Sequence, residues 1–309
     1  MESVTVHDSD QVSEISKAEG WEVDYVQLEA GQFEGHFARW PLHQLAVHQE
    51  HHDRHLEVLG TIRRGVEPFA LVLSGRSPGR FQGRACAPGD LAQMRSGSEC
   101  DFVLSKNLEL LIIHVPEDVL LRTGAAFDGD DAGNQRPVEP VVRLEPARAA
   151  HLAWLLRQVR DEAPACPTLF KEEIQSRVLS LLWQATRRSN TARGADSPAM
   201  PQRARHARHV IEILNEHLES PVTVEALAAA SGICPRTLQL SFREVFQISP
   251  MAYLRARRLH AAKKLLRISE PGEVSVTDVA MRFGFEHLGR FSGYYKSMFG
   301  ESPAQTLRV

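Results

Sequence analysis

Four neighbouring side chains in the last third of the chain have the chemistry to bond the bases of a duplex. Arg236 can donate two hydrogen bonds to O6 and N7 of guanine, and Gln239 can pair with adenine in the major groove. Thr237 is polar and lies beside them, while Leu240 suits apolar contact with a thymine methyl. Arg243 comes one helical turn later and suits a phosphate, a contact that positions a protein without reading sequence.

A second set of such positions follows about fifty residues later. Arg290 is its main candidate for reading a base, and Lys296 suits a phosphate. Gly289 and Gly293 bring no side chain, so a helix carrying them can approach a duplex closely but reads little of it. The other exposed positions expected in this set are His287, Leu288 and Ser292. We therefore expect the first set to carry most of the sequence specificity.

Both sets belong to an internal repeat, and repeats at a fixed offset indicate a reused supersecondary unit. Each copy reads as a helix-capping residue, a short helix, a glycine where the chain turns, and a second helix with apolar residues four apart. This is the pattern of a helix-turn-helix, in which the second helix enters the major groove. The offset is 52 residues for the pairs Thr223 with Ser275 and Gly232 with Gly284, and 53 for Leu238 with Phe291, Phe242 with Tyr295, and Pro250 with Pro303.

A long helix from about Pro250 to Leu266 is expected to join the two copies. If both second helices enter successive major grooves, it must space them by about one turn of DNA, roughly 34 Å. Between its apolar positions stand the basic residues Arg255, Arg257, Arg258, Lys263 and Lys264.

The rest of the chain predicts an α+β protein of two domains. Short apolar runs separated by turn residues predict strands from about 20 to 116, in a small sandwich or barrel. Apolar residues at helical spacing then predict two helices within about 146–188. We expect residues 1–188 to form the first domain, 189–202 a linker rich in small and polar residues, and 203–309 the all-helical domain with the repeats. The two helices of the first domain either cover the barrel or pair with a second subunit.

The C-terminal part, residues 205–307, resembles the DNA-binding domain of AraC/XylS-family transcription regulators. Two blocks carry the resemblance: Ala228, Gly232, Arg236, Leu238 and Phe242, and then Ala280, Gly284, Phe285, Phe291, Tyr295, Lys296, Phe299, Gly300 and Pro303. Among subgroups, the stretches 280–291 and 31–37 are similar to ethanolamine-utilisation regulators. Cys234 and Gln247 depart from the family pattern, which usually has a capping Ser and a Gly there.

The resemblance implies a cupin-like β-barrel followed by two helices, which binds a small-molecule effector. It also implies binding of double-stranded DNA, activation through RNA polymerase, and assembly as a homodimer; the sequence itself does not separate activation from repression. We expect a cytoplasmic regulator without a cofactor, and leave its ligand-binding residues unassigned, because strand register is not known from the sequence.

Composition and charge agree with this interpretation. The 309 residues are 43% hydrophobic and 24% charged, typical of a globular protein, with no apolar run long enough for a membrane span and no apparent secretory signal. The four scattered cysteines form no C-x-x-C pair, which favours reduced thiols. Residues 203–309 hold 15 Lys and Arg against 10 Asp and Glu, whereas the rest holds 21 against 29, so only the C-terminal part is expected to meet a polyanion.

The histidines between His43 and His55 suggest a different hypothesis, a metal-dependent cupin enzyme with an accessory DNA-binding tail. Strand alternation would send His43 and His48 to opposite faces, and we expect His51, His52, Asp53 and Arg54 to form a polar loop. A metal site needs three or four convergent ligands. No common catalytic motif is present, so we expect no metal and no catalytic residue.

Overall fold

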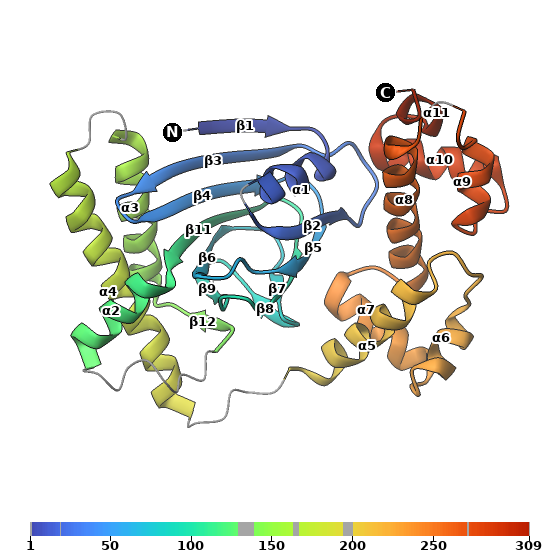
Figure 1. Ribbon diagram of the computed structural model, residues 1–309. Helices are drawn as coiled ribbons and strands as arrows, with labels where there is room; N and C mark the ends of the chain where they lie inside the picture. Colours follow the sequence, from blue (N-terminus) through green and yellow to red (C-terminus); the bar gives the residue numbers. More distant parts are fainter. Residues whose placement is uncertain are drawn as a thin grey trace.

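The computed structural model describes residues 2–18, 20–128, 139–162, 167–193, 200–270 and 272–308. A strand-rich domain with its own helices lies beside a purely helical domain (Figure 1). Fold class and the presence of two domains agree with the sequence-based prediction.

Two antiparallel sheets build the first domain. One has seven strands in the order β1-β3-β4-β11-β6-β9-β12, and the other has five in the order β2-β5-β10-β7-β8. The described strands thus form two sheets rather than one closed ring. Their bounds are β1 Glu2–Val6, β2 Glu22–Gln27, β3 Gly35–Leu42, β4 Leu45–His52, β5 Leu56–Thr61, β6 Val66–Ser74, β7 Gly79–Phe81, β8 Arg84–Cys86, β9 Asp90–Gln93, β10 Glu99–Leu104, β11 Leu108–Pro116 and β12 Val141–Arg143.

Several elements lie outside the ranges that the sequence pattern predicted. Strand β1 and helix α1 (Ser9–Ala18) precede the predicted strand region, and α2 (Glu117–Asp128) and β12 follow it. Strand β1 has four exposed residues out of five, so it carries little apolar alternation. It is recognisable only through its pairing with β3, where Glu2 lies opposite Arg39.

Alternation along the central strands divides the first domain into two cores. On β11, Leu111 and Ile113 face the helices, while Leu108 and Leu110 belong to the core between the sheets. Helices α3 (Pro146–Glu162) and α4 (Thr168–Arg193) supply the other half of the first core. The side chains that they bury there include Leu152, Leu155, Leu156, Val159, Ile174, Val178, Leu182 and Trp183.

The two helices therefore cover the seven-stranded sheet within one chain. Of the two possibilities left open by the sequence, the structure shows that these helices cover a sheet of their own chain, because their main apolar faces are buried there. Trp154 on α3 and Leu169 on α4 remain exposed, at 51% and 79%. Helix α4 continues to Arg193, inside the segment 189–202 expected to be a linker. Residues 194–199 of that segment lie outside the described residues.

The described residues of the second domain form seven helices around one apolar core. Their bounds are α5 Gln202–Glu216, α6 Val224–Ala230, α7 Pro235–Phe246, α8 Pro250–Ile268, α9 Val276–Arg282, α10 Leu288–Phe299 and α11 Pro303–Thr306. Tyr253 and Leu259 of α8 lie in this core beside Phe242 of α7 and Tyr295 of α10. The long helix α8 thus joins the two repeats, as predicted.

The two domains are in contact along α8. Val26, Leu28 and Val103 of the first domain belong to the same buried cluster as the helical domain. The backbone N–H of Gly31 donates to the carbonyl of Ser297 at 2.7 Å. The first domain therefore contacts the helical domain through buried side chains and a backbone hydrogen bond, in addition to the chain connection.

Candidate nucleic-acid interface and ligand cavity

Both repeats fold as helix-turn-helix units with the predicted caps. The side chain of Thr223 accepts from the backbone N–H of Ala226, and that of Ser275 accepts from Asp278 within a full capping box. Gly232 and Gly284 adopt φ of 66° and 73°, the left-handed region that a sharp turn requires. The local sequence is sufficient to set these turns, which fix where α7 and α10 begin.

Helix α7 presents one face to solvent. Leu238, Phe242, Val245 and Phe246 are buried, so the opposite face must be exposed. Arg236, Gln239, Leu240 and Arg243 are exposed there, and Thr237 is half-buried. All five residues of the first predicted reading set thus lie on the accessible side of this helix or at its edge.

Cys234 stands at the N-cap of α7 and makes no side-chain cap. Its Sγ lies 3.1 Å from Oγ1 of Thr237, which lowers the pKa of this exposed thiol. Pro235 instead sets the first helical φ. At the other end, Gln247 takes φ of 57°, so it occupies the left-handed position where the family usually has glycine.

The exposed face of helix α10 includes two glycines, so it offers fewer side chains than the exposed face of α7. His287, Leu288, Gly289, Arg290, Gly293 and Lys296 are exposed, and Ser292 is half-buried. A Cβ built on Gly289 or Gly293 would meet nothing within 4 Å. Neither glycine is therefore needed for packing inside the protein.

Helix α8 differs from the expectation that its basic residues simply alternate with apolar ones. Lys263 and Arg258 are buried, at 2% and 8% exposure. Arg258 donates to the backbone carbonyls of Leu218 and Ser220, which holds the segment after α5 against α8. The helix buries basic side chains because each one finds an oxygen partner, which sequence periodicity does not reveal.

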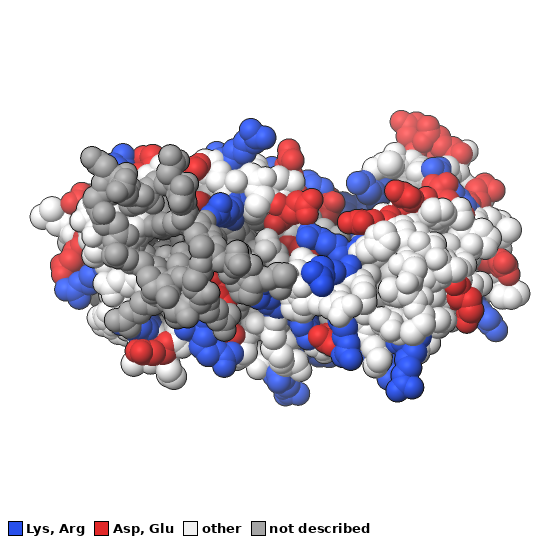
Figure 2. Space-filling view, turned by 90° about the horizontal axis from the view of Figure 1, so that it is seen from below, with Lys and Arg blue, Asp and Glu red and all other residues white. Residues whose placement is uncertain are grey.

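Ion pairs between the domains use much of the basic charge on α8. Lys263 binds Asp8, and its Nζ lies 3.2 Å from Oδ2 of Asp10. Arg267 lies 2.8 Å from Glu14, all three acids being on α1 or just before it. The contrast in charge between the two parts of the chain is thus partly satisfied within the protein. Figure 2 accordingly shows basic groups in separate clusters, with acidic groups between them, on the face seen from below.

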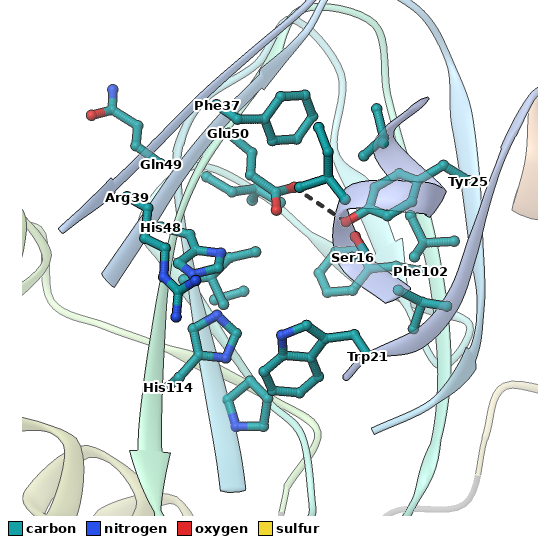
Figure 3. Close-up of a pocket in the computed structure, with 18 of the residues that line it drawn as sticks. Ser16, Trp21, Tyr25, Phe37, Arg39, His48, Gln49, Glu50, Phe102 and His114 are labelled. Atoms are coloured by element: carbon teal, nitrogen blue, oxygen red, sulfur yellow. Dashed lines mark hydrogen bonds between the residues drawn. The ribbon is translucent and has the colours of Figure 1, made fainter. Parts of the chain in front are cut away.

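A cavity of about 370 Å³ lies between the two sheets of the first domain, within the range typical of small-molecule sites. Most of its wall is apolar. Aromatic rings of Trp21, Tyr25, Phe37 and Phe102 line it together with aliphatic residues. The close-up shows its open centre between the side chains of the seven-stranded sheet and those of α1 and β2 (Figure 3).

Three nitrogen-bearing side chains gather at one part of this wall. Arg39 on β3 pairs directly with His48 on β4, and His114 on β11 lies two residues beyond Ile112, the partner of His48. The ring centroids of His48 and His114 are 4.4 Å apart, and Trp21 lies 4.5 Å from His114. We refer to Arg39, His48 and His114 as the basic wall.

Glu50 and Tyr25 mark another part of the cavity. The phenol of Tyr25 donates to Glu50 at 3.5 Å, a long hydrogen bond, and His52 lies 3.1 Å from the same carboxylate. Burial and the Glu50 carboxylate raise the pKa of Tyr25 well above its ordinary value. The phenol therefore stays protonated and available as a donor.

The prediction of a polar loop at residues 51–54 was wrong for residues 51 and 52. His51 and His52 belong to β4, and His52 is fully buried. His43 lies in the tight turn before β4 with φ of 53°, so strand alternation does not apply to it. Alternate residues His48, Glu50 and His52 share the cavity face of β4, a period-two signal that could have identified this strand from the sequence.

The histidines do not converge on a metal in the part of the chain described. Among these residues, no group of three or more His, Cys, Asp or Glu side chains is placed to hold an ion. Cys86, Cys100 and Cys234 are free thiols, and Cys166 lies outside the described residues. No helix in the described ranges has the length and apolar character needed to cross a bilayer.

Comparison with known proteins supports the helix-turn-helix assignment. A helix-turn-helix domain family matches residues 227–308. The XylDLEGF operon transcriptional activator of Pseudomonas putida is 29% identical over 246 residues, covering 77% of this chain and 73% of that protein. A probable thc operon regulatory protein of Rhodococcus erythropolis is 39% identical over 112 residues, 36% of this chain and 33% of that one.

A solved structure resembles the C-terminal part. A probable AraC family transcriptional regulator from Rhodopseudomonas palustris is 36% identical and covers 34% of this chain and 95% of that chain, with a TM-score of 0.32. With two capped helix-turn-helix units joined by one long helix, residues 227–308 form a helix-turn-helix domain, and the chain is similar to transcriptional activators of the XylS type.

Proposed function

We propose that this protein is a transcription activator whose DNA affinity is controlled by a small molecule bound in the cavity between the sheets. One observation carries the proposal: the same two elements, α1 and β2, form a wall of the cavity and hold the helix that joins the DNA-binding units. Val12 and Ile15 of α1 line the cavity, while Asp10 and Glu14 bind α8.

Strand β2 likewise contacts both the cavity and the helical domain. Tyr25 faces the cavity, whereas Gln27 contacts the helical domain. The backbone N–H of Gln27 donates to Nε2 of His260 at 3.0 Å, and its side-chain amide donates to the carbonyl of Met298 at 3.2 Å. A ligand that moves α1 or β2 would thus act on contacts to both α8 and α10, which gives differential affinity between two states a physical route.

DNA recognition is assigned to the exposed faces of α7 and α10. In α7, Arg236, Gln239 and Leu240 contact base edges, Thr237 supports them and Arg243 binds phosphate. Helix α8, with 19 residues and a length of about 28 Å at 1.5 Å per residue, joins the two units, and successive major grooves require about 34 Å between the two recognition helices. In α10 the contacts come from His287, Leu288, Gly289, Arg290, Ser292, Gly293 and Lys296.

The remaining partners follow from the same role. The P. putida relative is named as an activator, and activation implies contact with RNA polymerase in the cytoplasm. A homodimer would use the surface of α3 and α4 that stays exposed, including Trp154 and Leu169. A dimer places two copies of the helix-turn-helix pair on one operator.

Selection of DNA by the purified full-length protein tests the proposal. Random duplexes are enriched over several rounds, and the selected sites are compared with those of a variant carrying Arg236→Ala and Arg290→Ala. We expect a motif with two elements about 10 base pairs apart, which the variant does not enrich. If no motif is enriched, and DNA binding depends on the salt concentration but not on the DNA sequence, sequence-specific recognition is contradicted.

A further inference from the structure

One basic side chain of the joining helix α8 lies against the reading helix α10 instead of against the first domain. Arg255 is exposed, and its guanidinium carbon is 4.6 Å from the ring centroid of Tyr294 on α10. Among the described residues, Arg255 makes no ion pair. The other Lys and Arg side chains of α8 bind oxygens within the protein or line the cleft beside the first domain: Arg257, Arg258, Lys263, Lys264 and Arg267.

The position of Arg255 around the axis of α8 accounts for this difference. Tyr253 and Arg257 both contact Glu57 of the first domain. At 3.6 residues per turn, Arg255 points about 160° away from each of them. Figure 1 accordingly shows α8 between the strand-rich domain and α10. The side of α8 that carries Arg255 is therefore turned from the first domain toward the second helix-turn-helix unit.

Tyr294 lies at the edge of the α10 face that is assigned to DNA. It follows Arg290 by one helical turn and comes directly after Gly293. Its ring is 40% exposed. In the first unit, the equivalent position 53 residues earlier is Ser241, which is fully buried. The second unit thus presents an aromatic ring to solvent where the first unit packs a small side chain inside.

The two helices that carry this pair have no negative side chain. Neither α8 nor α10 contains Asp or Glu. The acids nearest to α10 along the chain, Glu286 and Glu301, lie beyond its two ends, and Glu301 accepts from Thr306. In the first unit, by contrast, Glu244 on α7 binds Arg203. A guanidinium stacked on a ring keeps its N–H donors, so Arg255 retains both its charge and its donors for an anion.

The exposed glycines of α10 give a reason for a contact at the edge of this helix. Gly289 and Gly293 have open space around their Cβ positions, so the backbone of α10 can approach a duplex closely. They bring no side chains of their own, however. Attraction to the DNA backbone must then come from cations beside the helix, because phosphate contacts supply most of the affinity that does not depend on sequence.

Resting on the proposed function, we propose that Arg255 binds a DNA phosphate beside the major groove that α10 enters, and that the ring of Tyr294 positions its guanidinium for this contact. The contact does not read sequence. Because Arg255 belongs to the helix that joins the two units, the contact fixes the orientation of α10 relative to the joining helix on the duplex.

The salt dependence of DNA binding by the full-length protein tests the role of Arg255. For Arg255→Gln, affinity for the selected duplex and for unrelated duplexes should fall alike, by about three- to tenfold near 0.1 M salt. The slope of log affinity against log salt should decrease by about 0.9. Lys264→Gln removes an exposed cation from the other side of the same helix and is the matched control, which should change neither quantity.

Substitutions of Tyr294 test whether its ring positions the guanidinium. Tyr294→Phe keeps the aromatic face and should leave affinity within about twofold of wild type. Tyr294→Leu keeps an apolar side chain but removes the ring, so it should lose about as much affinity as Arg255→Gln. If Arg255→Gln fails to fold, the comparison of Phe with Leu at position 294 tests the same contact with Arg255 in place. Equal affinities for these two variants would contradict a positioning role for the ring.

Neutral phosphates locate the contact on the DNA. Single phosphates of the selected duplex are replaced one at a time by methylphosphonates, and binding of wild type, Arg255→Gln and Lys264→Gln is compared. We expect a position beside the half-site of the second unit where the replacement weakens wild type and Lys264→Gln but leaves Arg255→Gln unchanged. The absence of such a position, an unchanged salt slope for Arg255→Gln, or a loss confined to one base pair would overturn the inference.

These failures are distinguishable from failure of the proposed function. Wild-type protein is tested on the selected and on unrelated duplexes in the same series. Sequence-specific binding that does not respond to Arg255→Gln leaves the regulator in place and removes only this contact. Absence of sequence-specific binding by wild type would contradict the proposed function together with the inference.

Discussion

Tyr253 on α8 donates its phenolic hydrogen to the carboxylate of Glu57 on β5, with oxygen–oxygen distances of 2.8 and 3.0 Å. Both residues are fully buried. Arg257, one helical turn along α8, lies 3.6 Å from the same carboxylate. Among the described residues, the side-chain partners of this buried first-domain acid come from the second domain, so separation of the domains would expose it to water or leave it unpaired.

This pair predicts a pH-dependent stability. Burial raises the pKa of Glu57 from 4.5 to about 7, against the opposing effects of Arg257 and Tyr253. The folded protein then holds a proton that the unfolded chain releases, so this contribution is present below pH 4.5 and is lost as the pH rises to about 7, on the order of 3 kcal/mol. Glu57→Gln keeps an acceptor for Tyr253 and should remove the dependence.

Urea unfolding at pH 5 and pH 8 measures the contribution of Glu57 to the pH dependence of stability. The unfolding free energy of Glu57→Gln, relative to that of the wild type, should be higher at pH 8 than at pH 5. Comparison within each pH cancels groups of opposite sign, such as His55, whose burial lowers its pKa to about 4. An equal difference at both pH values would show that Glu57 does not titrate in this range.

Lys263 is expected to be essential for docking of α8. Its amine is buried between Asp8 and Asp10, and Lys263→Gln would remove the cation that these two carboxylates share, which leaves Asp10 with Arg267 at 3.6 Å and His260 at 3.7 Å. Removing one partner of a buried pair costs about 3–5 kcal/mol, and because both acids are about a quarter exposed we expect about 2–3 kcal/mol. The neighbouring exposed residue provides the control: Lys264→Gln should change the unfolding free energy by less than about 0.5 kcal/mol.

Substitutions at Arg236 and Arg243 test the proposed roles of these two α7 side chains in reading bases and in binding phosphate. Arg236→Ala should weaken binding to the selected site by about 1–3 kcal/mol and relax the choice of base at one position. Arg243→Ala should weaken binding to all sequences alike and lower the salt dependence by about one counterion. Titrations on the selected duplex and on single-base variants at several salt concentrations distinguish them. A uniform loss for Arg236→Ala would assign it to a phosphate instead.

Substitution of Gly293 by alanine is expected to have opposite effects on the stability of the protein and on DNA binding. Space is open around its Cβ position and its φ is helical, so Gly293→Ala should stabilise α10 by up to about 1 kcal/mol. If α10 lies against a duplex there, the added methyl should nevertheless weaken DNA binding. Gly232→Ala is the contrasting control, because φ of 66° makes that substitution destabilising. Unchanged affinity for Gly293→Ala would show that this position does not approach DNA.

The sequence alone determined the second domain. Its caps, turn glycines and apolar spacing of four are local signals that each act within a few residues. Each signal occurs in both copies of the repeat. Thr223 and Ser275 cap as predicted, and the reading positions are exposed because Leu238 and Phe291 at the intervening positions are buried. Gly232 and Gly284 turn the chain for the same local reason.

Only the tertiary structure decided what the rest of the molecule does. His114, Arg39 and Trp21 come from three distant strands or loops, and their meeting depends on strand register, which no local pattern specifies. Burial of Lys263 and Glu57 likewise follows from the docking of two domains, because a lone charged side chain in a sequence normally indicates solvent. Local chemistry therefore fixed the exposed faces of α7 and α10, whereas long-range packing created the cavity and the contacts that connect it to α8.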